Sequence, residues 1–258
     1  MKNFYLKINP ADEKHKIISF LRKTFEKQNI DKAVIGLSGG IDSMVSFYLL
    51  KEVLPLKNVF VSHLYYDSSK FAEIKKVLDR LEFPKQNIYL LPIKSPVDEL
   101  SKILGIIDGP ADKIRKGNIM ARVRMITLFD RAKKNNALVC GTENKSENLL
   151  GYFTRFGDQA SDIEPISHLY KTQVYQLAKS LGVPNEIIEQ APSAGLWADQ
   201  TDEGEFGFTY EEADPVLCLT LEKNMSIKEI EKKGFKNVKK ILAFREKNLF
   251  KHQTPYQL

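Results

Sequence analysis

The chain has 258 residues, enough for one large α/β domain or two small ones, and its 43% hydrophobic and 28% charged residues are typical of a globular protein. No apolar run approaches the roughly 20 residues that span a bilayer, and the first residues do not look like a signal peptide, so we expect a cytoplasmic protein. The net charge of +6 and the pI near 9.0 favour an anionic ligand without choosing between nucleic acid and a polyphosphate substrate.

Apolar strands alternate with amphipathic helices in the first half of the chain. Strands are predicted at 33–37, 59–64, 88–91 and 137–140. Helices are predicted at 14–28, 43–53, 71–81 and about 118–134. Because parallel strands are joined by helices and buried on both faces, this alternation predicts an α/β fold with one open parallel sheet flanked by helices, of Rossmann-like type.

The pattern changes after the fourth strand. Residues 151–165 are rich in turn residues and charge, and a clear helix at 170–181 ends at Gly182. Residues 191–208 are acidic and contain glycine, so we expect a flexible loop there, before helices within 209–258. We expect the whole chain, 1–258, to form a single domain.

The cysteines and histidines predict no metal site or disulfide. Cys140 and Cys218 form neither a CxxC motif nor a recognisable disulfide framework, and both lie in apolar surroundings. The four histidines are scattered and give no zinc pattern. We therefore expect two free, buried thiols.

The segment from Gly36 to Ser43 reads GLSGGIDS and lies between a predicted strand and a predicted helix. Gly39 and Gly40 have no Cβ, so the backbone can turn sharply and approach a ligand closely. Unpaired N–H groups and the helix dipole favour a phosphate at the start of the helix. Asp42 would repel that phosphate unless Mg²⁺ lay between them. The segment therefore predicts a phosphate-binding loop with a magnesium ligand.

Two common nucleotide-binding motifs do not match this loop. The chain has no GxxxxGK[ST], so the loop is not a Walker loop, and no GxGxxG follows the first strand, as a Rossmann dinucleotide site requires. If no ligand binds, the segment is a strand–turn–helix junction in which Asp42 acts as a helix cap.

The fourth strand is followed by a polar segment, Gly141 to Glu147, which reads GTENKSE. Ligands of an open parallel sheet bind beyond the carboxyl ends of the strands, where the strand order reverses. If the fourth strand lies beside the first, Glu147 and Asp42 meet at that edge and could hold Mg²⁺ against a triphosphate. Taken alone, the segment is only a polar loop before a helix.

Basic and acidic side chains near this segment suit a nucleotide. Arg155 and Lys171 can bind phosphates, and Asp162 can accept hydrogen bonds from ribose hydroxyls. Arg122 and Arg124 lie about 200° apart around one predicted helix, so only one can face the site. The spacing does not say which.

The sequence Ser-Gly-Gly-x-Asp-Ser closely resembles the loop of the ATP pyrophosphatases, which adenylate a substrate, release pyrophosphate and let a nucleophile displace AMP. Further segments occur in an order typical of one family: KGNIMARVRM, GTENKSE, GYFTRFGD, LYKTQVYQLAKSLGVP and APSAGLWADQTDEGEFGFTYEEAD. On these segments the chain resembles the ammonia-dependent NAD synthetases over nearly its whole length.

The resemblance implies a reaction and a set of residues. The family adenylates the nicotinate carboxylate of deamido-NAD⁺ with ATP, and ammonia displaces AMP to give NAD⁺. By position, the implied catalytic residues are Asp42, Glu147, Asp158 and Lys171. Asp42 and Glu147 match the Mg²⁺ ligands, and Asp158 falls near the ammonia pocket, where it could help to deprotonate ammonium. The ATP-binding positions are Gly36, Leu37, Ser38, Gly39, Gly40, Ile41, Asp42, Ser43, Thr142, Lys171 and Ser193. The deamido-NAD⁺ positions are Arg122, Arg155, Asp162 and Lys251.

The resemblance also implies what surrounds the site. The family forms homodimers, so we expect a homodimer, with 191–208 as a lid that excludes water. Only 35 residues precede the loop, too few for a glutaminase, so ammonia is expected as the direct nitrogen source. The run Phe250-Lys251-His252 departs from the usual His-Lys-Arg, and a short segment after the second strand leaves the adenine contacts open.

Two other functions stay open. A tRNA-modifying or other amide-forming ATP pyrophosphatase would be expected to carry catalytic cysteines or a tRNA-binding appendage, and the sequence shows neither. A non-catalytic nucleotide-binding protein would be expected to have lost Asp42 or Glu147, and both are present. We therefore expect ATP, deamido-NAD⁺ and ammonia as partners, and neither nucleic acid nor a membrane.

Overall fold

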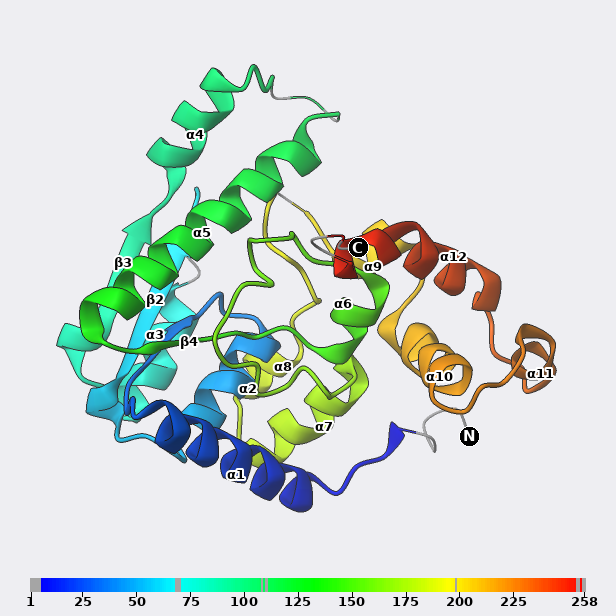
Figure 1. The fold of residues 1–258 in the computed structure, drawn as a ribbon, viewed down its shortest axis with the longest axis horizontal. Coiled ribbons are helices and arrows are strands. Elements are labelled where there is room, and N and C mark those ends of the chain that lie inside the picture. The colour runs from blue at the N-terminus through cyan, green and yellow to red at the C-terminus, as the bar shows by residue number, and fades with distance from the viewer. Residues whose placement is uncertain are drawn as a thin grey trace.

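The computed structural model describes residues 6–67, 71–107, 109, 111–197, 199–253 and 256. Its four parallel strands are in the order β3-β2-β1-β4 and comprise β1 (Ala33–Gly36), β2 (Val59–Tyr65), β3 (Ile88–Pro92) and β4 (Leu138–Cys140). The strands pair edge to edge in one open sheet, which confirms the predicted fold class (Figure 1).

Helices cover both faces of this sheet (Figure 1). They are α1 (Pro10–Gln28), α2 (Ile41–Leu50), α3 (Phe71–Arg80), α4 (Lys94–Ile103), α5 (Lys113–Asn135), α6 (Lys145–Leu150), α7 (Lys171–Leu181), α8 (Asn185–Ile188), α9 (Asp202–Phe206), α10 (Tyr210–Leu221), α11 (Ile227–Lys232) and α12 (Val238–Asn248). Short 3₁₀ turns lie at Leu56–Asn58, Lys85–Asn87 and Leu249–His252. No helix in the described part of the chain is long and apolar enough to cross a membrane.

The strand β1 positions the loop that follows it beside the loop that follows β4. It pairs with β2 on one side and β4 on the other, so the strand order reverses there. Ala33 is level with both Val59 and Leu138, and the strands run parallel, so the loops after β1 and β4 leave the same edge of the sheet. That edge is where open α/β sheets bind ligands.

The helix that follows β1 is buried almost all round. Every residue of α2 except Asp42 is buried, because the helix lies between the sheet, α1 and α7. Full burial of a side chain such as Phe47 contributes about 1.5–3 kcal/mol. The loop before α2 is therefore supported by a buried helix, and Asp42 is the one side chain of α2 that is not buried.

The C-terminal helices form a second apolar cluster with α6 and α9. Phe206, Phe208 and Tyr210 are buried in it, and the ring of Tyr152 packs edge-on against Phe206 with centroids 4.6 Å apart. The helices α10, α11 and α12 lie together at the end of the molecule away from β3 (Figure 1).

The second half of the predicted loop 191–208 contains a short helix. Residues 202–206 form α9, and Asp202 and Phe206 are each 3% exposed. The acidic first turn of α9 is capped by Thr201, whose hydroxyl accepts from the Gly204 N–H. The part of the predicted lid that precedes α9 is therefore 191–201, and its flexibility stays a prediction.

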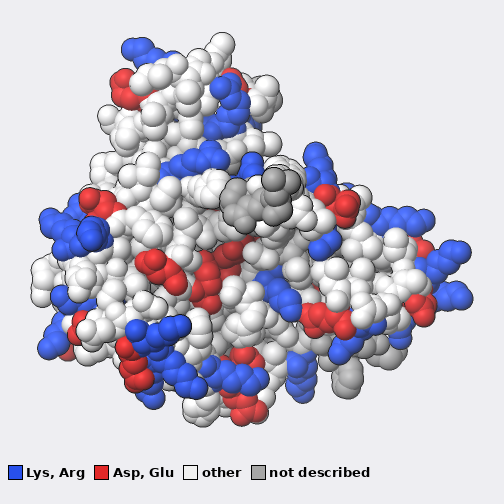
Figure 2. Space-filling model, viewed as in Figure 1, with Lys and Arg blue, Asp and Glu red and all other residues white. Residues whose placement is uncertain are grey.

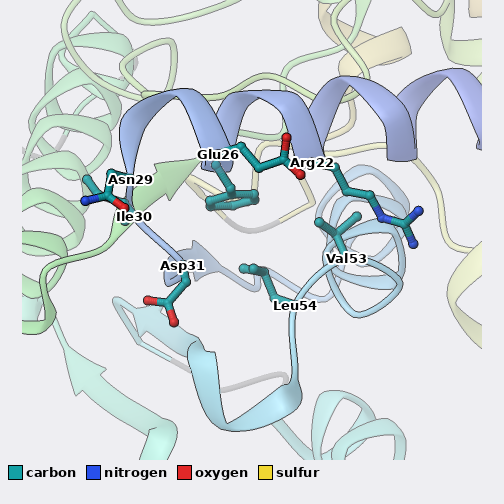
Figure 3. Close-up of a pocket in the computed structure, with 8 residues that line it drawn as sticks. Arg22, Glu26, Asn29, Ile30, Asp31, Val53 and Leu54 are labelled. Carbon is teal, nitrogen blue, oxygen red and sulfur yellow. The ribbon is translucent and has the colours of Figure 1, made fainter.

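A hollow of about 440 Å³ lies on the opposite side of the fold from these loops. Figure 3 shows it between the end of α1 and the segment that joins α2 to β2, with Asp31 just before β1. It therefore opens at the amino end of β1, where a parallel sheet does not bind its ligand.

Candidate active site

The glycine loop is held in shape by its own hydrogen bonds. Gly39 has a φ of +90°, in the left-handed region that favours glycine. The Gly40 N–H donates to Ser38 Oγ at 3.2 Å, and Ser43 Oγ donates to the Gly40 carbonyl at 2.9 Å. Gly40 is the N-cap of α2 and has no side chain to cap it. The first N–H groups of α2 are thus free of a side-chain cap, as an anion site requires.

Three charged side chains converge beside this loop: Asp42, Glu147 and Lys171. The ammonium of Lys171 contacts Asp42 Oδ2 and lies 3.6 Å from Glu147 Oε1. The Lys171 side chain is only 3% exposed, and its ammonium lies 5.4 Å from the centre of the Tyr210 ring. Burial alone would lower the pKa of Lys171, but the neighbouring carboxylates raise it further than burial lowers it. The structure therefore brings together the predicted residues of three separate elements.

Asn144 links the loop after β4 to the loop after β1. Its Nδ2 donates to Asp42 Oδ1 at 3.0 Å, and its Oδ1 accepts from the Glu147 N–H at 3.0 Å. Glu147 Oε2 in turn accepts from the Asn144 N–H at 3.3 Å, which completes a capping box on α6. Both carboxylates are thus oriented by one residue that was not among the predicted site residues.

A buried carboxylate, Asp214, fixes the junction of α6 and α7. It is fully buried, and its oxygens accept from Ser146 Oγ at 2.5 Å and from the Thr172 N–H at 2.8 Å. Ser146 Oγ also accepts from the Lys171 N–H at 2.8 Å. Burial raises the pKa of Asp214 to about 6. Asp214 thereby positions the backbone from which Lys171 and Glu147 project.

The donor set fits Mg²⁺ bound together with a polyphosphate. In the described residues, no group of three or more His, Cys, Asp or Glu side chains is arranged to hold a metal alone. Mg²⁺ commonly takes one or two carboxylates and completes its shell with phosphate oxygens and water. Burial and the charge of Asp42 raise the pKa of Glu147 well above its ordinary value. A bound cation would offset this unfavourable electrostatic environment.

The structure distinguishes the two arginines of α5. Arg122 is exposed, and its Nη2 donates to the Arg155 carbonyl at 3.2 Å. Arg124 reaches the carboxyl end of β2, where its Nε donates to the Leu64 carbonyl at 3.3 Å. Both arginines therefore lie near predicted site segments, on different sides of α5, and Arg124 is the one at the edge of the sheet.

The turn at 151–158 is tied to the C-terminal tail. Asp158 Oδ1 accepts from the Thr154 N–H at 2.9 Å. The ammonium of Lys251 donates to the carbonyls of Gly151 at 2.7 Å and Phe153 at 3.0 Å. The Arg155 guanidinium lies 5.2 Å from the centre of the ring of Phe250, the residue before Lys251. Lys251 is thus bonded to the backbone of this turn.

The remaining predicted residues lie at or near the same edge of the sheet. Asp162 is exposed, and its Oδ2 accepts from the Val139 N–H at 2.7 Å, within β4. Thr142 is partly buried just after β4, whereas Ser193 is exposed and its hydroxyl accepts from the Gly195 N–H. No hydrogen bond or ion pair joins these three residues to the Lys171 cluster in the described part of the chain.

An acidic pair that was not among the predicted site residues lies at the loop after β4. Glu164 Oε2 accepts from the Glu143 N–H at 3.1 Å, and Glu164 Oε1 accepts from Ser161 Oγ at 2.7 Å. Burial, together with their mutual repulsion, raises the pKa of Glu143 to about 8, and burial raises that of Glu164 to about 7. Figure 2 shows acidic side chains gathered near the middle of this face, where the loops between β4, α2 and α6 lie in Figure 1.

Comparisons with known proteins agree on one family. A family model described as NAD synthase matches residues 13–255. An NH(3)-dependent NAD(+) synthetase from Fusobacterium nucleatum is 41% identical over 252 residues, covering 97% of this chain and 96% of that protein.

Two solved structures have the same fold over almost their whole length. An NMN synthetase from Francisella tularensis has a TM-score of 0.81 at 32% identity and covers 98% of this chain and 99% of its own. An NH3-dependent NAD synthetase from Campylobacter jejuni, in complex with nitrate, has a TM-score of 0.78 at 29% identity and covers 97% of this chain and 100% of its own.

Proposed function

The chain belongs to the NAD synthase family, and from that premise we propose that it converts deamido-NAD⁺ to NAD⁺ with ATP and ammonia. A carboxylate oxygen of deamido-NAD⁺ attacks the α-phosphorus of ATP, and pyrophosphate leaves. Ammonia then attacks the carbonyl carbon of the acyl adenylate, loses a proton, and AMP leaves. The observation that carries the proposal is the meeting of Asp42, Glu147 and Lys171 beside the glycine loop.

We assign the nucleotide to the edge of the sheet at which β1 and β4 end. The backbone from Gly36 to Ser43 would cradle the phosphates, and Thr142 and Ser193 would contact ATP from the loops that follow β4 and α8. Asp42 and Glu147 would hold Mg²⁺, which neutralises the phosphates and the departing pyrophosphate when it is bound. Lys171 would stabilise the same charge from the protein side.

We assign deamido-NAD⁺ to the segments around the 151–158 turn. Arg122 and Arg155 are neighbours there and can face the phosphates of the dinucleotide, and Lys251 is close by. Asp162 would accept ribose hydroxyls. Asp158 would accept a proton from ammonium, which leaves ammonia as the nucleophile that attacks.

A reaction with defined products tests this function. The protein is incubated with ATP, Mg²⁺, deamido-NAD⁺ and ammonium, and the products are separated by chromatography. We expect NAD⁺, AMP and pyrophosphate in equal amounts. Release of ADP in place of AMP would contradict the ATP pyrophosphatase chemistry. The deamido form of NMN is run in parallel, because the Francisella tularensis relative is named an NMN synthetase and makes that mononucleotide the second candidate acceptor.

We also propose a homodimer that forms through α4 and the start of α5. Large apolar side chains stand exposed there: Leu100, Ile103, Leu104, Ile107 and Ile114, with Ile103 at 76% and Ile107 at 78% exposed. These helices project from the rest of the molecule (Figure 1). Large apolar side chains gathered on one exposed projection of this kind favour a protein interface.

Charge substitution at this projection is expected to give monomers. Two aspartates in place of Ile103 and Ile107 would place desolvated charges in the interface, at a cost of several kcal/mol, while both positions tolerate charge in the monomer. Light scattering after size exclusion measures the mass. Ile227→Asp, at the 37% exposed start of α11, is the matched control and should leave the dimer intact. A wild-type protein that already runs as a monomer would refute the dimer.

We place the reaction in the cytoplasm. Cys140 and Cys218 are free and buried, as in proteins of reducing compartments. ATP, on which the proposed reaction depends, is abundant there.

A further inference from the structure

Lys171 lies where the proposed function needs a metal ion. Its ammonium contacts Asp42 and lies 3.6 Å from Glu147, the two carboxylates that would hold Mg²⁺. Two cations cannot share that space without strong repulsion, because the site is buried and poorly screened. Metal binding therefore requires the ammonium to move to another acceptor.

Asp202 offers such an acceptor. It is 3% exposed at the start of α9, and its Oδ2 accepts from the Tyr210 hydroxyl at 3.0 Å. Its Oδ1 is buried and accepts no hydrogen bond of good geometry, although the Tyr152 hydroxyl, which donates to Glu205 at 3.0 Å, interacts with the same carboxylate. A buried carboxylate oxygen without a well-placed donor is costly, so this oxygen is free to accept from a cation that comes within reach.

The position of Asp202 is fixed from two sides. Its N–H donates to the Pro192 carbonyl at 3.0 Å, and Tyr210, which holds its Oδ2, is the residue whose ring lies beneath the Lys171 ammonium. The negative charge of Asp202 acts on both Lys171 and Glu147. Lys171 and Asp202 thus both lie against Tyr210, and their charges are close enough to interact.

We propose that Lys171 pairs with Asp42 and Glu147 when the metal is absent, and with Asp202 and the phosphates when Mg²⁺ and the nucleotide are bound. Asp202 is then a positioning residue. By accepting the Lys171 ammonium, it lowers the free-energy cost of freeing Asp42 and Glu147 for the metal. This inference rests on the proposed function, which supplies the metal.

A double-mutant cycle separates this role from a simple effect of charge. Calorimetry gives the affinity for the non-hydrolysable analogue α,β-methylene-ATP with Mn²⁺ and, separately, in EDTA. The ratio of the two affinities is the gain due to the metal. It is measured in the wild type, Asp202→Asn, Lys171→Met and the double variant. Thermal melting checks that each variant folds, and Asp202→Ser replaces Asp202→Asn if the latter does not fold.

We expect Asp202→Asn to reduce the metal gain about tenfold in the wild-type background, within the coupling that contacting residues show. In the Lys171→Met background no ammonium has to leave the metal ligands. There we expect Asp202→Asn to change the metal gain by less than about twofold. An equal loss in both backgrounds, or no loss in either, overturns the inference. A wild type that binds the analogue no more tightly with Mn²⁺ than in EDTA would instead refute the metal site of the proposed function.

Discussion

Replacement of Asp42 by asparagine is expected to lower kcat/KM for ATP by about a thousandfold. Asparagine has the shape of aspartate and can still accept from Asn144 Nδ2, so the loop geometry should survive. The loss is that of a charged metal ligand, and with it the stabilisation of negative charge on the departing pyrophosphate, which is worth several kcal/mol. The rate is measured as AMP release at saturating deamido-NAD⁺ and ammonium.

The same substitution should also lower stability, because the buried Lys171 ammonium loses its closest partner. Breaking a buried ion pair from one side costs about 3–5 kcal/mol when no water replaces the partner. Asp79→Asn is the matched control, since Asp79 forms an exposed pair with Lys75 on α3 and should change neither activity nor melting temperature. If Asp42→Asn keeps more than about a tenth of wild-type activity, Asp42 is no metal ligand in turnover.

The sequence predicts the sheet and the meeting of Asp42 with Glu147 because both follow from strand order. Parallel strands require that the loops after β1 and β4 share an edge, and the pattern of apolar runs shows those strands. Element ends were less accurate. The first helix begins at Pro10, because Asn9 caps it and proline is favoured in its first turn, four residues before the predicted start.

The long helix α5 likewise begins at Lys113, five residues before its predicted start at 118. In the structure Gly117 lies inside this helix, and the side chain of Leu196 approaches to 2.9 Å of where a Cβ would stand. A contact between residues so far apart in the chain leaves no local signal.

The partners of the site were missed for the same reason. Asn144 and Glu147 have the spacing of a capping box, which the sequence does display, but the bond from Asn144 to Asp42 spans 102 positions. Asp202 and Asp214 look like ordinary surface acids in an acidic stretch, and only the packing of α9 and α10 buries them. Burial of a charge is a tertiary property, so a single sequence cannot reveal it.

Replacement of Lys171 by methionine is expected to lower kcat by about a thousandfold while KM for ATP changes much less. Methionine fills the buried space of the lysine stem but carries no charge, so the interaction that is lost is the one made with the charge that develops on the leaving pyrophosphate. Stopped reactions that measure AMP at several ATP concentrations separate the two constants.

This variant should respond to metal in a way that the wild type does not. Without the ammonium, Asp42, Glu147 and Asp202 repel one another in a buried site, so the variant should melt at a lower temperature in EDTA and recover much of the loss in Mg²⁺. Lys179→Met, in the exposed last turn of the same helix, is the control and should show neither effect. A Lys171→Met protein that melts like the wild type in EDTA would mean that the three carboxylates do not depend on this lysine for their charge balance.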